Sequence, residues 1–145
     1  MTTNLFTQTP AARDAPYQSL TVLRKKMFYT AGATAVVVGV VPPKAIVVGG
    51  GVFVHTATNA GTNNLINVGF AVGAGDATAD PDAFATLLST AAKGFIALDE
   101  LAAVTNTRVD TERTITATFA MSGTAATAGE VEIIILVSTD HEGGA

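Results

Sequence analysis

Short runs of Val, Ile and Ala, cut apart by Gly, Thr, Asn and Pro, recur along the chain from about residue 21 onwards. Apolar runs of this length, rich in β-branched residues and bounded by turn residues, are typical of β-strands. The cleanest alternation spans residues 113–121, where Ile115, Ala117 and Phe119 fall on one face and threonines fall on the other. The pattern therefore predicts an all-β chain that folds as an antiparallel β-sandwich of jelly-roll type.

The pattern divides into about eight strands. They are expected at residues 21–29, 35–41, 45–48, 52–58, 65–71, 95–104, 113–121 and 131–139. Gly49, Gly50 and Gly51 separate two of these strands and predict a bulge or a sharp bend. Residues 132–138 are apolar on both faces, so this strand is expected to be central in a sheet or to contact another subunit.

One short helix is predicted between the strands at 65–71 and 95–104. The sequence Asp80-Pro81-Asp82 supplies a capping residue, a proline suited to the first helical position and a carboxylate near the positive end of the helix dipole. Phe84, Leu87 and Leu88 follow at helical spacing, and Gly94 lies beyond the expected end. These signals predict a helix of about two turns.

The chain is expected to form one domain with two appendages. Residues 21–140 carry the sandwich pattern, residues 1–20 form an extended N-terminal arm, and residues 141–145 form a flexible tail. The arm has no periodicity, which leaves two interpretations: a disordered terminus, or a segment that becomes ordered on a partner. In the second interpretation Leu5, Phe6 and Tyr17 are the apolar anchors.

Charge is distributed unevenly along the chain. Residues 1–44 carry five basic residues and one acidic residue, whereas residues 45–145 carry three basic and eleven acidic residues. The adjacent bases at 24–26 suit the edge of a sheet, where charge prevents unwanted strand pairing. A nucleic-acid contact is the competing interpretation, but a net charge of −4 disfavours it. The predicted partner-binding residues are Leu5, Phe6, Arg13, Tyr17, Arg24, Lys25 and Lys26.

Candidate chemistry is sparse. The chain has no cysteine, and His55 and His141 stand alone without a nearby carboxylate at a useful spacing, so we expect no catalytic site. Asp76, Asp80 and Asp82 do not match the spacing of a calcium loop, and we expect no metal. No glycine-rich segment leads from a strand into a helix as cofactor binding requires, so no cofactor is expected.

The amino-acid composition bears on whether the protein crosses a membrane, is secreted or binds other subunits. Apolar residues make up 48% of the chain and charged residues 14%, yet no run of 18 apolar residues exists to span a membrane. The first ten residues have neither a basic region nor an apolar core, so no signal peptide is expected. A chain with so few charges is expected to cover part of its apolar surface with other subunits, which predicts a homotrimer.

The segment from Gly32 to Val137 resembles a module found in structural proteins of tailed-phage particles. The matching pieces are Pro43-Lys44-Ala45, the run Thr62-Asn63-Asn64-Leu65-Ile66-Asn67-Val68-Gly69, the aspartate-rich turn that leads into a short helix at Asp80–Phe84, and Ala128-Gly129-Glu130-Val131-Glu132-Ile133. The resemblance implies a β-sandwich or jelly-roll domain of the kind found in capsid decoration (cement) proteins and in tail or fibre proteins. It implies a structural role in the particle without selecting a location.

We therefore expect a head decoration protein, made in the host cytoplasm, that binds the major capsid protein on the capsid exterior. By touching several capsid subunits it would stabilise the shell against the pressure of the packaged DNA. A tail-tube, tail-tip or fibre module is the first alternative, because it requires the same β-sandwich. A carbohydrate-binding sandwich is an alternative of another class, disfavoured because the chain has no Trp and only two Tyr.

Overall fold

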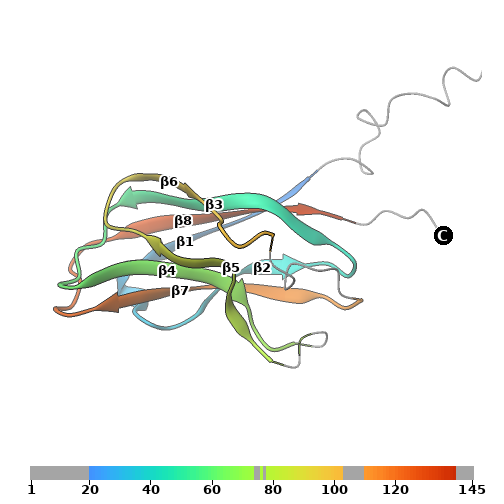
Figure 1. Ribbon diagram of the computed structural model, residues 1–145, viewed down its shortest axis with the longest axis horizontal. Coiled ribbons are helices and arrows are strands. Elements are labelled where there is room, and N and C mark those ends of the chain that lie inside the picture. Colours follow the sequence, from blue (N-terminus) through green and yellow to red (C-terminus); the bar gives the residue numbers. More distant parts are fainter. Residues whose placement is uncertain (1–19, 74–75, 77, 103–109, 140–145) are drawn as a thin grey trace, which may run out of the picture.

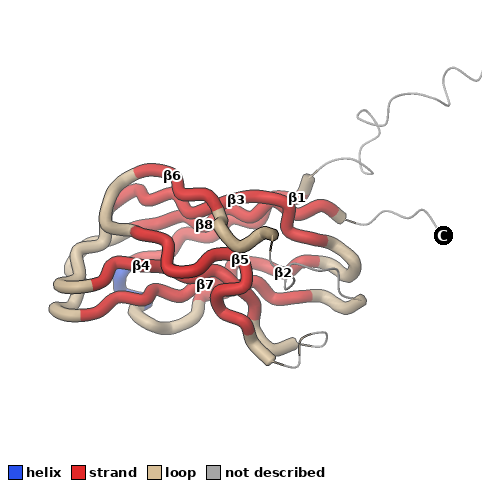
Figure 2. Tube along the Cα trace, viewed as in Figure 1, coloured by secondary structure: helices blue, strands red, loops and turns tan. Residues whose placement is uncertain are grey.

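Eight strands stack as two antiparallel sheets of four strands each (Figures 1 and 2). The computed structural model of the protein describes residues 20–73, 76, 78–102 and 110–139. The first sheet has the strand order β1-β8-β3-β6, and the second has the order β2-β7-β4-β5. Two four-stranded sheets linked by chain crossovers form the jelly-roll type of sandwich, which confirms the predicted fold class.

Outside residues 46–56 and 80–89, the strands lie close to the predicted positions. They are β1 (Thr21–Phe28), β2 (Val36–Val41), β3 (Ile46–Thr56), β4 (Asn63–Phe70), β5 (Asp80–Ser89), β6 (Gly94–Ala97), β7 (Arg113–Ser122) and β8 (Glu130–Ser138). The strand expected at residues 95–104 is shorter than predicted, since β6 ends at Ala97. The predicted edge strand and central strand are both confirmed, because β1 borders the first sheet and β8 lies between β1 and β3.

The helix predicted from Asp80 is wrong, because this segment forms strand β5. β5 pairs with β4 at the edge of the second sheet, where Pro81 is tolerated because an edge strand does not need every backbone N–H in the ladder. Leu87 has a φ of 52°, and its N–H donates to Asn67 Oδ1 over 2.6 Å. Pairing with β4 and burial of Phe84 thus override the local helix signals. The helical structure in the described residues is a 3-10 turn at Tyr29–Ala31.

The glycine triplet lies inside one strand instead of separating two. β3 runs through it as a single strand of 11 residues, with a register shift against β8 between Val47 and Gly49. The predicted bulge is therefore confirmed. Gly50 has a φ of 123°, and a Cβ there would collide with the carbonyl oxygen of Ile134. Any side chain at this position would force β3 away from β8.

The core lies between the two sheets. Alternate residues of β8 are fully buried at Val131, Ile133, Ile135 and Val137, and the intervening residues face outward. From the second sheet the largest buried side chains are Phe84, Phe119, Ile66 and Ile115. The outward residues Ile134 and Leu136 are half-buried, so β8 is apolar on both faces as its sequence predicted.

The two ends of the sandwich are formed by different parts of the chain. We define the turn end by the four connections at residues 29–35, 57–62, 90–93 and 123–129. We define the terminal end as the opposite end, where β1 begins beside the last residues of β8, with Thr21 opposite Val137. Both ends of the described chain therefore leave the fold at the terminal end (Figure 1).

Candidate docking surfaces

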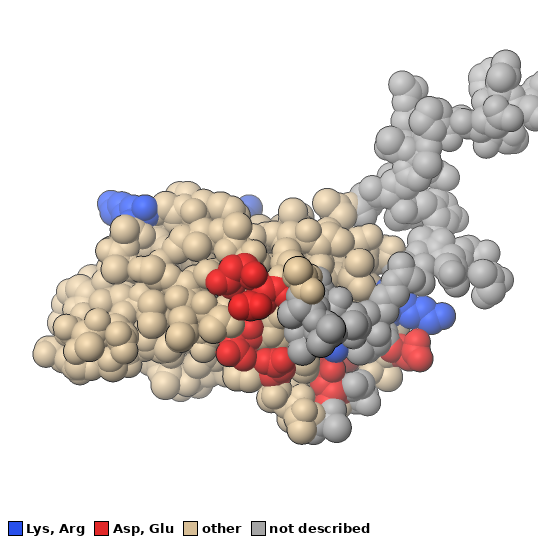
Figure 3. Space-filling view, viewed as in Figure 1, with Lys and Arg blue, Asp and Glu red and all other residues tan. Residues whose placement is uncertain are grey.

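The turn end is almost free of charge. Lys93 is the one charged residue in its four connections, all of which the structure describes. On the face seen in Figure 3, acidic side chains gather over β5 and the segment that follows β6, away from the turn end. Depletion of charge is typical of the central part of a protein–protein interface.

Amide and hydroxyl groups hold the connections of the turn end together. Asn59 Oδ1 accepts hydrogen bonds from the N–H groups of Thr127 and Ala128, at 2.8 and 3.0 Å. The Asn59 side-chain amide donates to Thr127 Oγ1 over 2.9 Å. The N–H of Gly61 donates to the carbonyl of Thr124, also over 2.9 Å. These bonds tie residues 57–62 to residues 123–129, so the turn end is preorganised without ion pairs.

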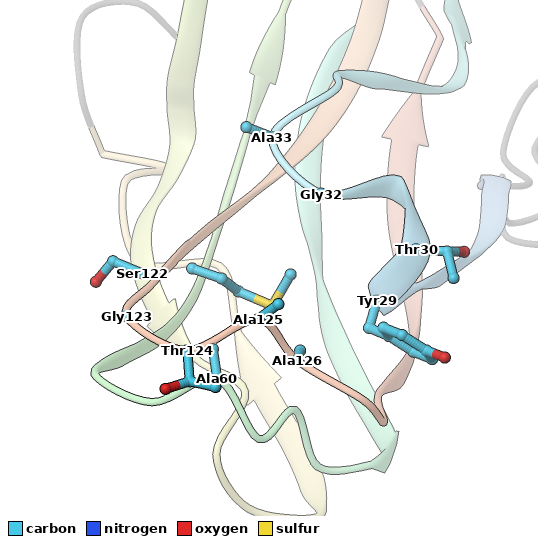
Figure 4. A pocket seen from close by; sticks show the side chains of 11 residues that line it. Tyr29, Thr30, Gly32, Ala33, Ala60, Ser122, Gly123, Thr124, Ala125 and Ala126 are labelled. Atoms are coloured by element: carbon cyan, nitrogen blue, oxygen red, sulfur yellow. The ribbon is translucent and has the colours of Figure 1, made fainter.

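A cavity of about 300 Å³ opens at the turn end, between the 3-10 turn and the β7–β8 connection (Figure 4). Its lining residues are small or apolar, apart from hydroxyl groups, and none carries a charge. They are Tyr29, Thr30, Gly32, Ala33, Ala60, Met121, Ser122, Gly123, Thr124, Ala125 and Ala126. An uncharged pocket in a rigid surface can accept an apolar side chain of a partner, which is how many interfaces gain most of their affinity.

The terminal end is held by a buried ion pair. Arg113 donates from Nε and Nη2 to the two carboxylate oxygens of Asp76, at 2.9 and 2.8 Å, and both side chains are buried. The guanidinium carbon lies 4.2 Å from the centre of the Phe70 ring, which adds a cation–π contact. Sequence inspection missed this pair, because Asp76 and Arg113 are far apart in the chain and neither lies in a recognisable motif.

Two further carboxyl groups interact at the start of β5. Burial, followed by a hydrogen bond with Asp82, raises the pKa of Asp80 above its ordinary value of 3.8. The sequence had assigned both residues to helix capping, which is wrong because no helix begins there. The third aspartate, Asp76, pairs with Arg113 instead. Among the described residues no three His, Cys, Asp or Glu side chains come together in a way that could hold a metal.

The three predicted basic residues of β1 are on both faces of the edge strand. Arg24 and Lys26 point outward and pair with Glu132 and Glu130 of β8, at 2.7 and 2.8 Å. Lys25, opposite Ile133, has the other orientation and is exposed. Arg24 and Lys26 are therefore neutralised within the chain.

The remaining predicted docking residues, Leu5, Phe6, Arg13 and Tyr17, lie outside the described residues, as do the predicted tail at 141–145 and His141.

His55, for which the sequence showed no carboxylate at a useful spacing, lies beside Glu132 of the neighbouring strand β8. Its Nε2 lies 3.2 Å from Glu132 Oε2, and its ring contacts Phe53 edge-on at 4.7 Å between ring centres. The hydrogen bond from His55, together with Arg24, lowers the pKa of Glu132. A second lowered pKa belongs to Glu130, which accepts a hydrogen bond from Lys26. In the described part of the chain, no helix is long and apolar enough to cross a membrane.

Comparison with known proteins finds similarity in fold and not in sequence. No family model and no curated protein matches the sequence. A chain in the capsid of Ralstonia phage GP4 superposes with a TM-score of 0.65 at 17% identity, covering 88% of each chain. A chain in the capsid asymmetric unit of cyanophage Pam1 superposes with a TM-score of 0.58 at 13% identity, covering 84% of this chain and 86% of that chain. This protein therefore shares the jelly-roll fold of chains in two phage capsids over most of its length.

Proposed function

We propose that this protein is a structural component of a tailed-phage particle, and specifically a head decoration protein that binds the major capsid protein on the outer capsid as a homotrimer. The observation that carries the proposal is that the fold superposes on chains of two phage capsids over 88% and 84% of this chain. The uncharged, preorganised turn end supports it, because it has the composition of a surface made for protein contact.

A decoration protein stabilises a shell when it binds two or more capsid subunits at once, since the subunits separate only after it is released. The proposed docking elements are joined to opposite ends of the sandwich. The arm, residues 1–20, with Leu5, Phe6, Arg13 and Tyr17, is joined to β1 at the terminal end, whereas the pocket lies at the turn end. Two contacts on one molecule, repeated over three copies, raise the avidity without any single strong contact.

Attachment of purified protein to shells that lack it tests this function. The full chain should bind, and deletion of residues 2–18 should abolish binding while leaving the sandwich folded, because the described fold begins near Thr21. The circular dichroism and melting temperature of the truncated protein provide the folding control. Normal decoration by the truncated protein would show that the arm is not a docking element.

The turn-end pocket has a matched pair of variants. Ala125→Glu places a charge in the pocket lining, whereas Ala92→Glu places the same charge on an exposed position of the same end that does not line the pocket. We expect Ala125→Glu to reduce the number of bound copies and Ala92→Glu to leave it unchanged. Equal effects of the two variants on the number of bound copies would show that the pocket is not part of the docking surface.

A further inference from the structure

The sheet edges formed by the described strands are not protected equally. A free edge can pair with another chain, and proteins block such edges with charge, with proline or by keeping the strand short. β1 carries three adjacent bases, β5 carries Pro81 between two aspartates, and β6 has only four residues. β2 has six residues and contains neither a charge nor a proline. The edge of β2 is therefore open to an added strand.

The outward side chains of β2 are apolar and exposed. Val37 and Val40 are exposed to 53% and 42%. A register shift against β7 between Val37 and Gly39 bends the strand, but it puts no polar side chain on the free edge. An extended segment that pairs with β2 would cover these valines and satisfy the free backbone groups of the strand at the same time. This mode of recognition is strand addition.

Two exposed bases lie beside this edge. Lys25 shares the face of β1 that carries Leu23, and a Cβ at Gly39 of β2 would lie 3.1 Å from Leu23 Cδ1, so Lys25 is on the side of β1 next to β2. Lys44 is exposed in the turn that follows β2. Neither lysine forms an ion pair with any residue that the structure describes. Lys25 and Lys44 therefore favour a segment that carries acidic residues.

The edge of β2 is continuous with the turn-end pocket. Gly32 and Ala33 line the pocket and shortly precede Val36, the first residue of β2 (Figure 4). The last residue, Val41, pairs with Arg113, so β2 runs from the turn end to the terminal end. A strand added to β2 thus reaches the pocket at one end and the exposed lysines towards the other.

We propose that the free edge of β2 binds an extended segment of the major capsid protein as an added strand. The segment places an apolar side chain in the turn-end pocket and acidic side chains beside Lys25 and Lys44. This inference rests on the proposed function and specifies the chemistry of the capsid segment that the decoration protein binds.

Hydrogen exchange measured by mass spectrometry tests the contact on the full chain. Peptides that span residues 36–41 are compared between the free protein and the protein attached to shells that lack it. Strand addition should slow the exchange of the β2 amides that face the free edge by about tenfold, because each gains a hydrogen bond. β6 is also an edge strand and is the internal control, so residues 94–97 should exchange equally in both samples.

Two matched pairs of variants identify the side chains. Val40→Glu and Val22→Glu place the same charge on edge strands of opposite sheets, at positions exposed to 42% and 49%. The Kd for shells should rise about tenfold for Val40→Glu and stay unchanged for Val22→Glu. Lys25→Glu should raise the Kd about fivefold, whereas Lys93→Glu, an equal charge change at the turn end, should leave it unchanged. Circular dichroism checks that each variant is folded.

Each outcome decides a separate point. Attachment without slower exchange in β2, or equal effects within either pair of variants, overturns this contact and leaves the decoration function intact. Slow exchange in the free protein that becomes fast on deletion of residues 2–18 assigns the edge to the arm and overturns the proposal. Exchange that slows with protein concentration in the absence of shells assigns the edge to a second copy and also overturns it. Failure of the full chain to attach to shells overturns the decoration function together with this contact.

Discussion

The two ends of the sandwich are held by different chemistry. At the turn end, amide and hydroxyl hydrogen bonds join the β3–β4 and β7–β8 connections, and Lys93 is the one charge in the four turns. At the terminal end, a buried Arg113–Asp76 pair and a close pair of aspartates lie at the starts of β7 and β5 of the second sheet and in the connection before β5. The comparison shows how one fold separates a neutral end, whose composition suits protein contact, from an end that holds a buried ion pair.

The largest difference between the ends should appear when one partner of the buried ion pair is removed. Arg113→Met leaves the Asp76 carboxylate buried without its guanidinium, and this should lower the free energy of unfolding by about 3–5 kcal/mol. Urea denaturation of both proteins measures the loss. The double variant Arg113→Met/Asp76→Leu removes both charges and should recover most of it. A single variant as stable as the wild type would show that the pair does not hold the terminal end.

The turn end should respond less strongly to the loss of one side chain. Asn59→Ala removes three hydrogen bonds between connections that remain partly accessible to water, so the expected loss is about 1–2 kcal/mol in the same urea experiment. Asn63→Ala is the matched control, because Asn63 is exposed and its side chain makes no hydrogen bond within the described residues. An equal loss in the two variants would mean that these bonds do not stabilise the turn end.

The smallest expected effect concerns the aspartate pair, and it depends on pH. The fold raises the pKa of Asp80, so above that pKa the charged side chain lowers the stability of the folded state. Below the ordinary value of 3.8 the side chain is protonated in both the folded and the unfolded protein, and this loss of stability disappears. Asp80→Asn should therefore raise the melting temperature slightly at pH 7 and give no gain near about pH 3. Asp110→Asn, at an exposed position, changes the net charge equally and is the control. A gain that is the same at both pH values would indicate that the pair does not interact.

Glu130 and Glu132 should show the opposite dependence on pH. Both pKa values are lowered by partners in the fold, so their contribution to stability is present above the ordinary value of 4.5 and is lost as the pH falls through the lower folded values.

The sequence predicted the fold well wherever the signal repeats along a strand. The alternation at residues 113–121 identified β7 and its buried face, and the apolar residues on both sides of β8 identified a central strand. It failed at Asp80, where three residues typical of a helix start begin an edge strand. Capping preferences amount to about 1 kcal/mol, which pairing with β4 and burial of Phe84 outweigh.

The candidate docking surfaces were less accessible from sequence. The pocket is assembled from three separate segments by hydrogen bonds across the turn end, and no local pattern signals it. The ion pairs of Arg24 and Lys26 depend on the register of β1 against β8, which the sequence does not reveal. The basic triplet was recognised, but the partners that neutralise two of its charges were not.

The number of copies per particle tests the central claim most directly. A head decoration protein that repeats over the capsid lattice should be present at on the order of hundreds of copies, as measured by quantitative mass spectrometry of purified particles against the major capsid protein. Particles made without it should assemble but release their DNA sooner on heating. A count of only a few to a few tens of copies, with normal heat resistance and lost adsorption to the host, would contradict the capsid role and assign the protein to the tail.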